Sequence, residues 1–140
     1  LNAAGQVDIL VNNSGGAAPG DFRDWTRDTW ISALDANMLT AFALIQAVID
    51  PMIDQKFGRI VNITSGSVKS PIPTLGLNAA KKEHISLAAA RDMLEKRNPA
   101  TRLDEIHEIE FACEWMCSAL LGYLTGQNIL IDGGSFNSTF

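Results

Sequence analysis

The sequence of 140 residues is long enough for one domain with one hydrophobic core, and its 46% hydrophobic and 19% charged residues are typical of a globular protein. The formal net charge of −5 argues against a nucleic-acid partner, because phosphate contacts need a basic surface. The most apolar stretch, residues 39–53, is interrupted by Gln46, Asp50 and Pro51, so we expect no membrane-spanning segment.

The first elements in chain order are a strand and a long helix. Residues 7–11 form a short β-branched run, and the polar loop 12–16 follows it, as after a buried parallel strand. Residues 25–56 have the apolar spacing of a helix. We expect Thr26 or Asp28 to cap its start, Pro51 to kink it or split off its last turn, and Gly58 to stop it.

A second buried strand is predicted at residues 59–64, and the rest of the chain alternates between loops and helices. The predicted helices begin near residues 77–82 and cover 85–96 and 104–121, with a break at 97–99, and a last strand covers 127–132. This order predicts an α/β fold in which helices flank a parallel sheet.

All three predicted strands end in small or polar residues. Ligands of such sheets bind beyond the carboxyl ends of the strands, which favours a binding site there. Short loops need the same residue types, so the two interpretations carry equal weight.

The cysteines, Cys113 and Cys117, are four residues apart in a predicted helix, where one face could supply half of a metal site. Neither His84 nor His107 completes a ligand spacing, so we expect no metal and interpret both cysteines as small buried hydrophobic residues. Free thiols fit a reducing cytoplasm. The chain shows no signal peptide and begins with Leu1 rather than methionine, which hints at a processed or partial chain.

Three segments together resemble the short-chain dehydrogenase/reductase family, in its 3-oxoacyl carrier-protein reductase-like branch. Residues 8–15 (Asp-Ile-Leu-Val-Asn-Asn-Ser-Gly) are similar to the Asn-Asn-Ala-Gly signature that ends the family's fourth strand. Residues 58–65 (Gly-Arg-Ile-Val-Asn-Ile-Thr-Ser) resemble the fifth strand with the catalytic serine, and residues 120–134 resemble the last strand and its approach. The resemblance covers the later half of a full family member.

The resemblance implies a Rossmann-like parallel sheet with flanking helices, a single partial domain over 1–140, and an enzyme that uses NAD or NADP. The implied reaction reduces a carbonyl or oxidises an alcohol of a small-molecule substrate. In the family, the long helix and the last strand build subunit interfaces, so the resemblance also implies a homo-oligomer, a dimer or tetramer.

The resemblance also assigns individual residues. Ser65 matches the serine that orients the substrate carbonyl, with Thr64 as the second candidate. Asn37 matches the helix asparagine that supports a proton-relay water, and Lys81 matches the lysine that holds the nicotinamide ribose. The residues that match the cofactor-side signature are Asn12, Asn13 and Gly15. Structural alternatives are a backbone hydrogen bond for Asn37, a turn for Ser65 and a solvated helix surface for Lys81.

The sequence departs from the family in three ways. Leu77 stands where the family has its catalytic tyrosine, and the only tyrosine, Tyr123, lies near the last strand. No Gly-x-Gly-x-x-Gly turn occurs, so cofactor binding by this chain alone is in doubt. The resemblance implies a strand and its crossover helix, roughly 30 residues, between His84 and Ile85, and the sequence has no counterpart of them. The alternative function is therefore a catalytically inactive family member that acts as an oligomer partner or scaffold.

Overall fold

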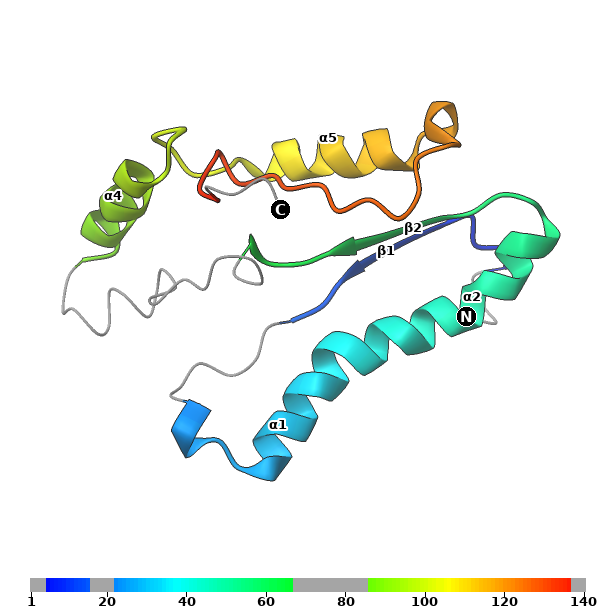
Figure 1. The fold of residues 1–140 in the computed structure, drawn as a ribbon, viewed down its shortest axis with the longest axis horizontal. Coiled ribbons are helices and arrows are strands. Elements are labelled where there is room, and N and C mark those ends of the chain that lie inside the picture. Colours follow the sequence, from blue (N-terminus) through cyan, green and yellow to red (C-terminus); the bar gives the residue numbers. More distant parts are fainter. Residues whose placement is uncertain (1–4, 16–21, 67–85, 137–140) are drawn as a thin grey trace. The chain divides into compact units, whose positions relative to one another are not determined.

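The computed structural model describes residues 5–15, 22–66 and 86–136. In chain order the elements are β1 (Ile9–Asn13), η1 (Phe22–Asp24), α1 (Arg27–Leu34), η2 (Asp35–Leu39), α2 (Thr40–Asp54), β2 (Arg59–Ile63), α4 (Leu87–Arg97), α5 (Ile106–Cys117) and η4 (Ala119–Leu121) (Figure 1). The chain forms two compact units, of which the first comprises residues 1–64 and 113–123 and the second the remainder.

The sheet of the first unit confirms two predicted strands and their direction. β1 and β2 are parallel neighbours, and their register pairs Ile9 with Arg59 and Asn13 with Ile63. The ladder is preceded by a bond in which the Arg59 backbone N–H donates to the Asp8 carbonyl at 3.0 Å. The carboxyl ends of both strands therefore lie at one edge of the sheet.

A nearly continuous helix from Arg27 to Asp54 connects the two strands, close to the predicted 25–56. Thr26 caps it, because its hydroxyl oxygen accepts a hydrogen bond from the Thr29 backbone N–H at 3.3 Å. In the middle, η2 is a π-helical turn. α2 then packs on β1 and buries Val48 and Met52, which are 2% and 5% exposed.

The end of α2 differs from the prediction. The helix runs through Pro51, and a Schellman motif closes it: the Lys56 N–H donates to the Ile53 carbonyl at 3.0 Å and the Phe57 N–H to the Met52 carbonyl at 3.2 Å. Lys56 occupies the left-handed position of this motif, with φ of 57°. Gly58 has another role, because a Cβ atom there would lie 2.6 Å from the Met52 sulfur.

In the second unit, α4 confirms the helix predicted at 85–96 and its break at 97–99. The Ser86 hydroxyl oxygen caps its start by accepting from the Ala89 N–H at 3.1 Å. Two exposed ion pairs, Arg91–Glu95 and Asp92–Lys96, lie along α4, and in each pair the two partners are one helical turn apart. The predicted helix 104–121 is shorter in the structure and ends with α5 at Cys117.

The prediction of a strand at residues 127–132 is wrong. This segment forms no strand in the structure, and its end is held by a turn instead. The Ala100 N–H donates to the Gly133 carbonyl at 3.1 Å, and the Asn98 side-chain amide donates to the Asp132 carbonyl at 3.1 Å. Strand preference depends on packing against a neighbouring strand, and the described residues offer this segment none.

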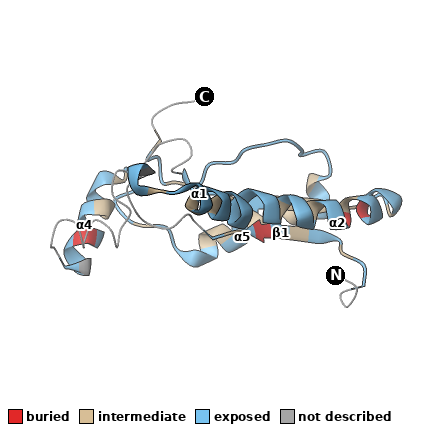
Figure 2. Ribbon diagram, turned by 90° about the horizontal axis from the view of Figure 1, so that it is seen from below, coloured by how far each residue is buried: buried red, intermediate tan, exposed pale blue. Residues whose placement is uncertain are grey.

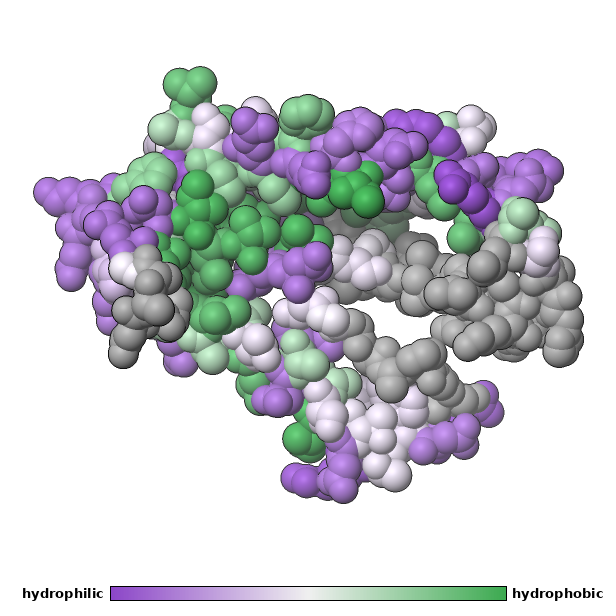
Figure 3. All heavy atoms as spheres, turned by 180° about the vertical axis from the view of Figure 1, so that it is seen from behind, coloured by the Kyte–Doolittle hydropathy of each residue, from purple (hydrophilic) through white to green (hydrophobic). Residues whose placement is uncertain are grey.

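Burial is sparse. Among the described residues the buried apolar side chains are Val48, Met52 and Ala90, and Figure 2 shows red only at α2, β1 and α4. Large apolar side chains such as Phe42, at 54%, and Ile53, at 63%, are exposed, and Figure 3 shows apolar spheres gathered on an open surface. Residues 27–54 are long and apolar enough, by length and composition alone, to cross a membrane, a test that the core helix of a soluble protein also passes.

Candidate functional site

The carboxyl ends of β1 and β2 bring two asparagines together. Asn12 and Asn62 occupy the same register position on neighbouring strands. The Asn12 side-chain N–H donates to the Asn62 Oδ1 atom at 2.8 Å. Asn12 is 6% exposed, whereas Asn62 is exposed. This amide pair ties the two strands together one residue before they end.

The other oxygen of the pair has no donor among the described residues. Asn12 Oδ1 is buried, and no N–H or O–H group in the described part of the chain bonds to it. A buried acceptor without a donor costs about 1–3 kcal/mol, so this atom marks a position where a donor would be stabilising. Asn62 was not singled out from the sequence, although its place in the second strand, level with Asn12, is the signal that would have found it.

Asn13 and Gly15 continue the same edge. Asn13 ends β1 and is exposed, and a Cβ atom on Gly15 would meet nothing within 4 Å. This stretch therefore leaves room for a ligand beyond the strand end.

Asn37 lies in the π-helical turn. Its side-chain N–H donates to the Ala33 carbonyl at 2.8 Å, and the side chain is exposed. In the same turn, the Thr40 hydroxyl donates to the Asp35 carbonyl at 2.9 Å. The bond to Ala33 is the local backbone role named above as the alternative, and it leaves the Asn37 side-chain oxygen as the atom available to a water.

Ser65 comes two residues after the end of β2 and is exposed, as is Thr64. Lys81, like Leu77, lies outside the described residues. The structure thus brings Asn12, Asn13 and Asn62 to one edge, whereas the Asn37 side chain bonds within its own helix, to the Ala33 carbonyl.

The two cysteines are free and half-buried. Burial raises the pKa of the Cys117 thiol, the neighbouring Cys113 raises it further, and the Arg59 guanidinium opposes both effects. Arg59 lies over the Phe57 ring at 4.9 Å and donates to the Ser118 carbonyl at 3.5 Å. Within the described ranges no three His, Cys, Asp or Glu side chains gather as metal ligands.

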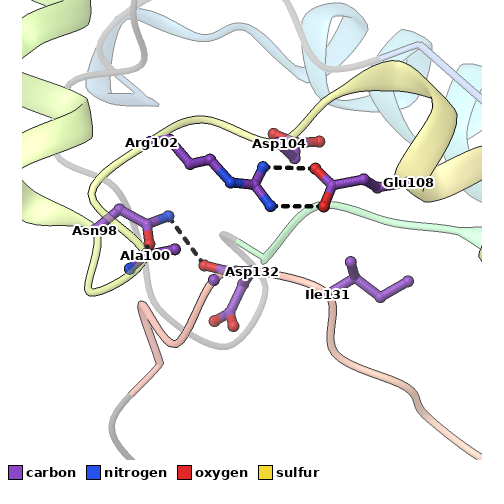
Figure 4. A pocket seen from close by; sticks show the side chains of 8 residues that line it. Asn98, Ala100, Arg102, Asp104, Glu108, Ile131 and Asp132 are labelled. Carbon is purple, nitrogen blue, oxygen red and sulfur yellow. Dashed lines mark hydrogen bonds and ion pairs between the residues drawn. The ribbon is translucent and has the colours of Figure 1, made fainter.

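A second polar cluster, in the other unit, was not identified from the sequence. Arg102 and Glu108 form a doubly hydrogen-bonded ion pair with distances of 2.6 and 2.7 Å, beside a hollow of about 130 Å³ (Figure 4). Arg102 and the Glu105 backbone N–H lower the pKa of Glu108 to about 2. Asp132 accepts hydrogen bonds from the Gly134 and Phe136 N–H groups, so its carboxylate fixes the turn that closes the hollow.

The sequence profile of the family described as short chain dehydrogenase matches residues 1–97. The chain belongs to this family. The match includes both strands and the long helix between them, and it confirms the resemblance drawn from the residues.

Curated relatives agree with the match. An acetoacetyl-CoA reductase from Cupriavidus necator is 29% identical over 93% of this chain and 66% of its own length. The 3-oxoacyl-[acyl-carrier-protein] reductase FabG from Haemophilus influenzae is 28% identical over 98% of this chain and 70% of its own length. They confirm the 3-oxoacyl reductase-like branch.

Solved structures confirm the fold as a Rossmann-like sheet with flanking helices. A gluconate 5-dehydrogenase from Burkholderia cenocepacia, in complex with NADP and tartrate, has a TM-score of 0.80 at 27% identity and covers 98% of this chain and 68% of its own. An actinorhodin polyketide ketoreductase with NADPH has a TM-score of 0.83 at 21% identity, over 98% of this chain and 70% of its own.

The chain is shorter than these relatives, and part of the difference is internal. It spans 66% of the Cupriavidus necator reductase. That alignment runs over 163 positions, whereas 93% of 140 residues is about 130 residues. About 33 aligned positions, the difference between 163 and 130, therefore have no residue of this chain opposite them.

Proposed function

We propose that the chain is part of a nicotinamide-dependent oxidoreductase that interconverts a carbonyl and an alcohol on a small molecule, with a 3-oxoacyl thioester as its substrate class. The observation that carries the proposal is the polar edge formed where parallel β1 and β2 end. In α/β sheets this is where ligands bind. The curated relatives named above as reductases support the substrate class.

In this proposal Ser65 donates a hydrogen bond to the substrate carbonyl oxygen. The free side-chain oxygen of Asn37 holds a water that relays protons, because its N–H is already bonded to Ala33. Lys81 binds the nicotinamide ribose. Each of these three groups binds or orients the substrate, a water or the cofactor. None of them replaces the tyrosine hydroxyl as the proton donor.

The cofactor-side residues fit one end of a nicotinamide dinucleotide. Asn12 offers an unpaired oxygen, and Gly15 leaves space. Asn13 adds an exposed amide at the same edge. When bound, NAD or NADP would supply or accept the hydride. The sequence has no Gly-rich turn for the pyrophosphate, so we expect weak binding by this chain alone.

Leu77 favours a second function. A hydrocarbon side chain cannot transfer a proton, and general acid–base catalysis typically contributes about 10² to 10⁴ in rate. The second candidate is a family member that has lost the reaction and acts as an oligomer partner or scaffold.

We further propose one partial domain over 1–140, with the internal gap between His84 and Ile85, which both lie outside the described residues. The gap of about 33 positions is close to the roughly 30 residues of a strand with its crossover helix. We also propose that the protein forms a homo-oligomer, a dimer or tetramer, and that it is located in the cytoplasm. The long helix lies within the matched residues, which supports a core helix rather than a membrane span.

The test is cofactor binding, followed by turnover. Nicotinamide fluorescence measures NADH and NADPH binding to the purified chain, and acetoacetyl-CoA then serves as substrate. Binding together with turnover that falls in Ser65→Ala and survives in Ser67→Ala supports the enzyme. Binding without turnover favours the scaffold, and the absence of any nicotinamide binding contradicts the enzyme.

A further inference from the structure

The asparagine pair of β1 and β2 is unusual for its position inside a sheet. Asparagine is depleted in strands, because its amide competes with the backbone for hydrogen bonds. Asn12 and Asn62 nevertheless occupy the same register position, one residue before each strand ends. The pairs that precede them in the ladder are Ile9–Arg59, Leu10–Ile60 and Val11–Val61. Strand formation alone therefore does not explain two adjacent amides at this position.

The two amides have different surroundings. Asn12 is 6% exposed, whereas Asn62 is exposed, so solvent can satisfy the remaining polar atoms of Asn62. The Asn12 side-chain N–H donates to Asn62 Oδ1 at 2.8 Å. Asn12 Oδ1 is buried and has no donor among the described residues. The bond to Asn62 therefore holds a buried amide whose other side is left open.

The orientation of this amide decides what it can bind. A side-chain amide donates from its nitrogen and accepts at its oxygen, and a half-turn about its last torsion exchanges the two. Because Asn62 Oδ1 takes the Asn12 N–H, the open side is the acceptor oxygen. With the amide turned over, Asn12 would offer a donor there instead.

We propose that Asn62 is a positioning residue, which holds the Asn12 amide so that its oxygen is available to a hydrogen-bond donor of the ligand. As in the function proposed above, on which this role rests, Asn12 lies on the cofactor side of the site. The ligand groups that fit an acceptor are a hydroxyl or an amide N–H, and a nicotinamide dinucleotide carries both. A phosphate oxygen is itself an acceptor and does not fit.

A simple tether between the two strands is the alternative role of Asn62, and two substitutions separate the roles. A carboxylate accepts but cannot donate, so Asn62→Asp keeps the Asn12 amide in the same orientation. Asn62→Val removes the acceptor and introduces a residue that favours strands. Ile60→Val, one register pair away on the same strand, is the matched control.

The first experiment uses the chain without a cofactor. In protein labelled with ¹⁵N at asparagine, the Asn12 side-chain proton that bonds to Asn62 should have a downfield NMR shift. We expect this shift to remain in Asn62→Asp and Ile60→Val and to be lost in Asn62→Val. A wild-type Asn12 amide without the downfield shift, or a shift that Asn62→Val leaves unchanged, would overturn the proposed orientation.

The second experiment titrates NADPH into the same labelled proteins, at about 1 M salt so that the added charge of Asn62→Asp is screened. We expect NADPH to shift the Asn12 amide resonances. Its dissociation constant should rise about three- to tenfold in Asn62→Val, the effect of one lost hydrogen bond, and stay near the wild-type value in Asn62→Asp and Ile60→Val.

The outcomes of the titration separate this role from the proposed function. Equal NADPH affinity in wild type and Asn62→Val would overturn the positioning role while the proposed function stands. If NADPH shifts no resonance in any of the proteins, the proposed function and the cofactor-facing role of Asn62 both fail. Lower unfolding stability in Asn62→Val with unchanged NADPH affinity would identify Asn62 as a tether only.

Discussion

The family resemblance sets Leu77 at the position of the catalytic tyrosine, and its hydrocarbon side chain neither donates nor accepts a proton. The family's reaction needs an acid beside Ser65, and an unperturbed phenol with a pKa of about 10 becomes useful near neutrality only beside a positive charge. Lys81 lies four residues later in the sequence and would supply that charge.

We therefore expect Leu77→Tyr to raise the rate of acetoacetyl-CoA reduction about 10²-fold or more. Leu77→Phe adds a ring of similar size without the hydroxyl and should leave the rate unchanged. Steady-state kinetics with NADPH measure both. Equal rates in the two variants would show that a missing proton donor does not limit this chain.

The asparagine pair shows which site residues the sequence can predict. Asn12 was found because a strand-end signature names it, whereas Asn62 was passed over because its importance depends on register across the sheet. Parallel register is set by pairing between distant segments, and residue spacing within one segment does not encode it. Arg102 and Glu108 were missed for a different reason: they are close in the sequence, but the geometry of an irregular loop, rather than a helix or strand spacing, brings them together.

At the scale of elements, the ends of helices are the most instructive. Thr26 and Asn98 lie where the sequence predicted a start and a break. The end of α2 was predicted at Gly58, yet the left-handed residue is Lys56. Glycine was the obvious candidate from the sequence, but close packing on Met52 accounts for Gly58 instead.

Replacing Lys56 with glycine should stabilise the protein. A side chain at φ of 57° is strained, and glycine removes a penalty of roughly 1 kcal/mol. We expect Lys56→Gly to raise the free energy of unfolding in urea by about that amount. Lys56→Ala keeps the Cβ atom and should gain little, so a larger gain from alanine would contradict the explanation.

The Arg102–Glu108 pair should make stability depend on pH in acid. The pKa of Glu108 is lowered from 4.5 to about 2, so its contribution is complete above pH 4.5 and is lost as the pH falls toward 2. Both side chains are partly exposed, and the effect is correspondingly small. Denaturation curves of wild type and Glu108→Gln should converge over this window and differ at pH 6. A constant difference would refute the assignment.

At the scale of the whole molecule, the sequence predicted an α/β fold and an incomplete one. Both parallel strands and the long helix followed from local periodicity. The last strand, predicted at residues 127–132, did not form, because a strand needs a neighbour that the described residues do not supply. We expect the aligned positions that have no residue of this chain opposite them to account both for this missing strand and for the exposed apolar side chains.

Restoring the internal segment should stabilise the chain. The test inserts, between His84 and Ile85, the residues of the Cupriavidus necator reductase that align with the gap. We expect this insertion to raise the solubility and the melting temperature of the chain. Each large apolar side chain that becomes buried contributes about 1.5–3 kcal/mol. A Gly/Ser insert of equal length is the control and should change neither. If calorimetry and sedimentation show the same stability and solubility for both inserts, the missing internal segment is not what limits the stability of the chain.

The π-helical turn at Asp35–Leu39 has the geometry of a single residue inserted into a regular helix. Such an insertion advances everything that follows it by about 100° around the helix axis. α2 follows this turn, packs on β1 and buries Val48 and Met52. Excising Ala36 would restore an unbroken α-helix, yet it would turn Val48 and Met52 away from the sheet. We therefore expect the single extra residue of this turn to decide which side of α2 faces β1.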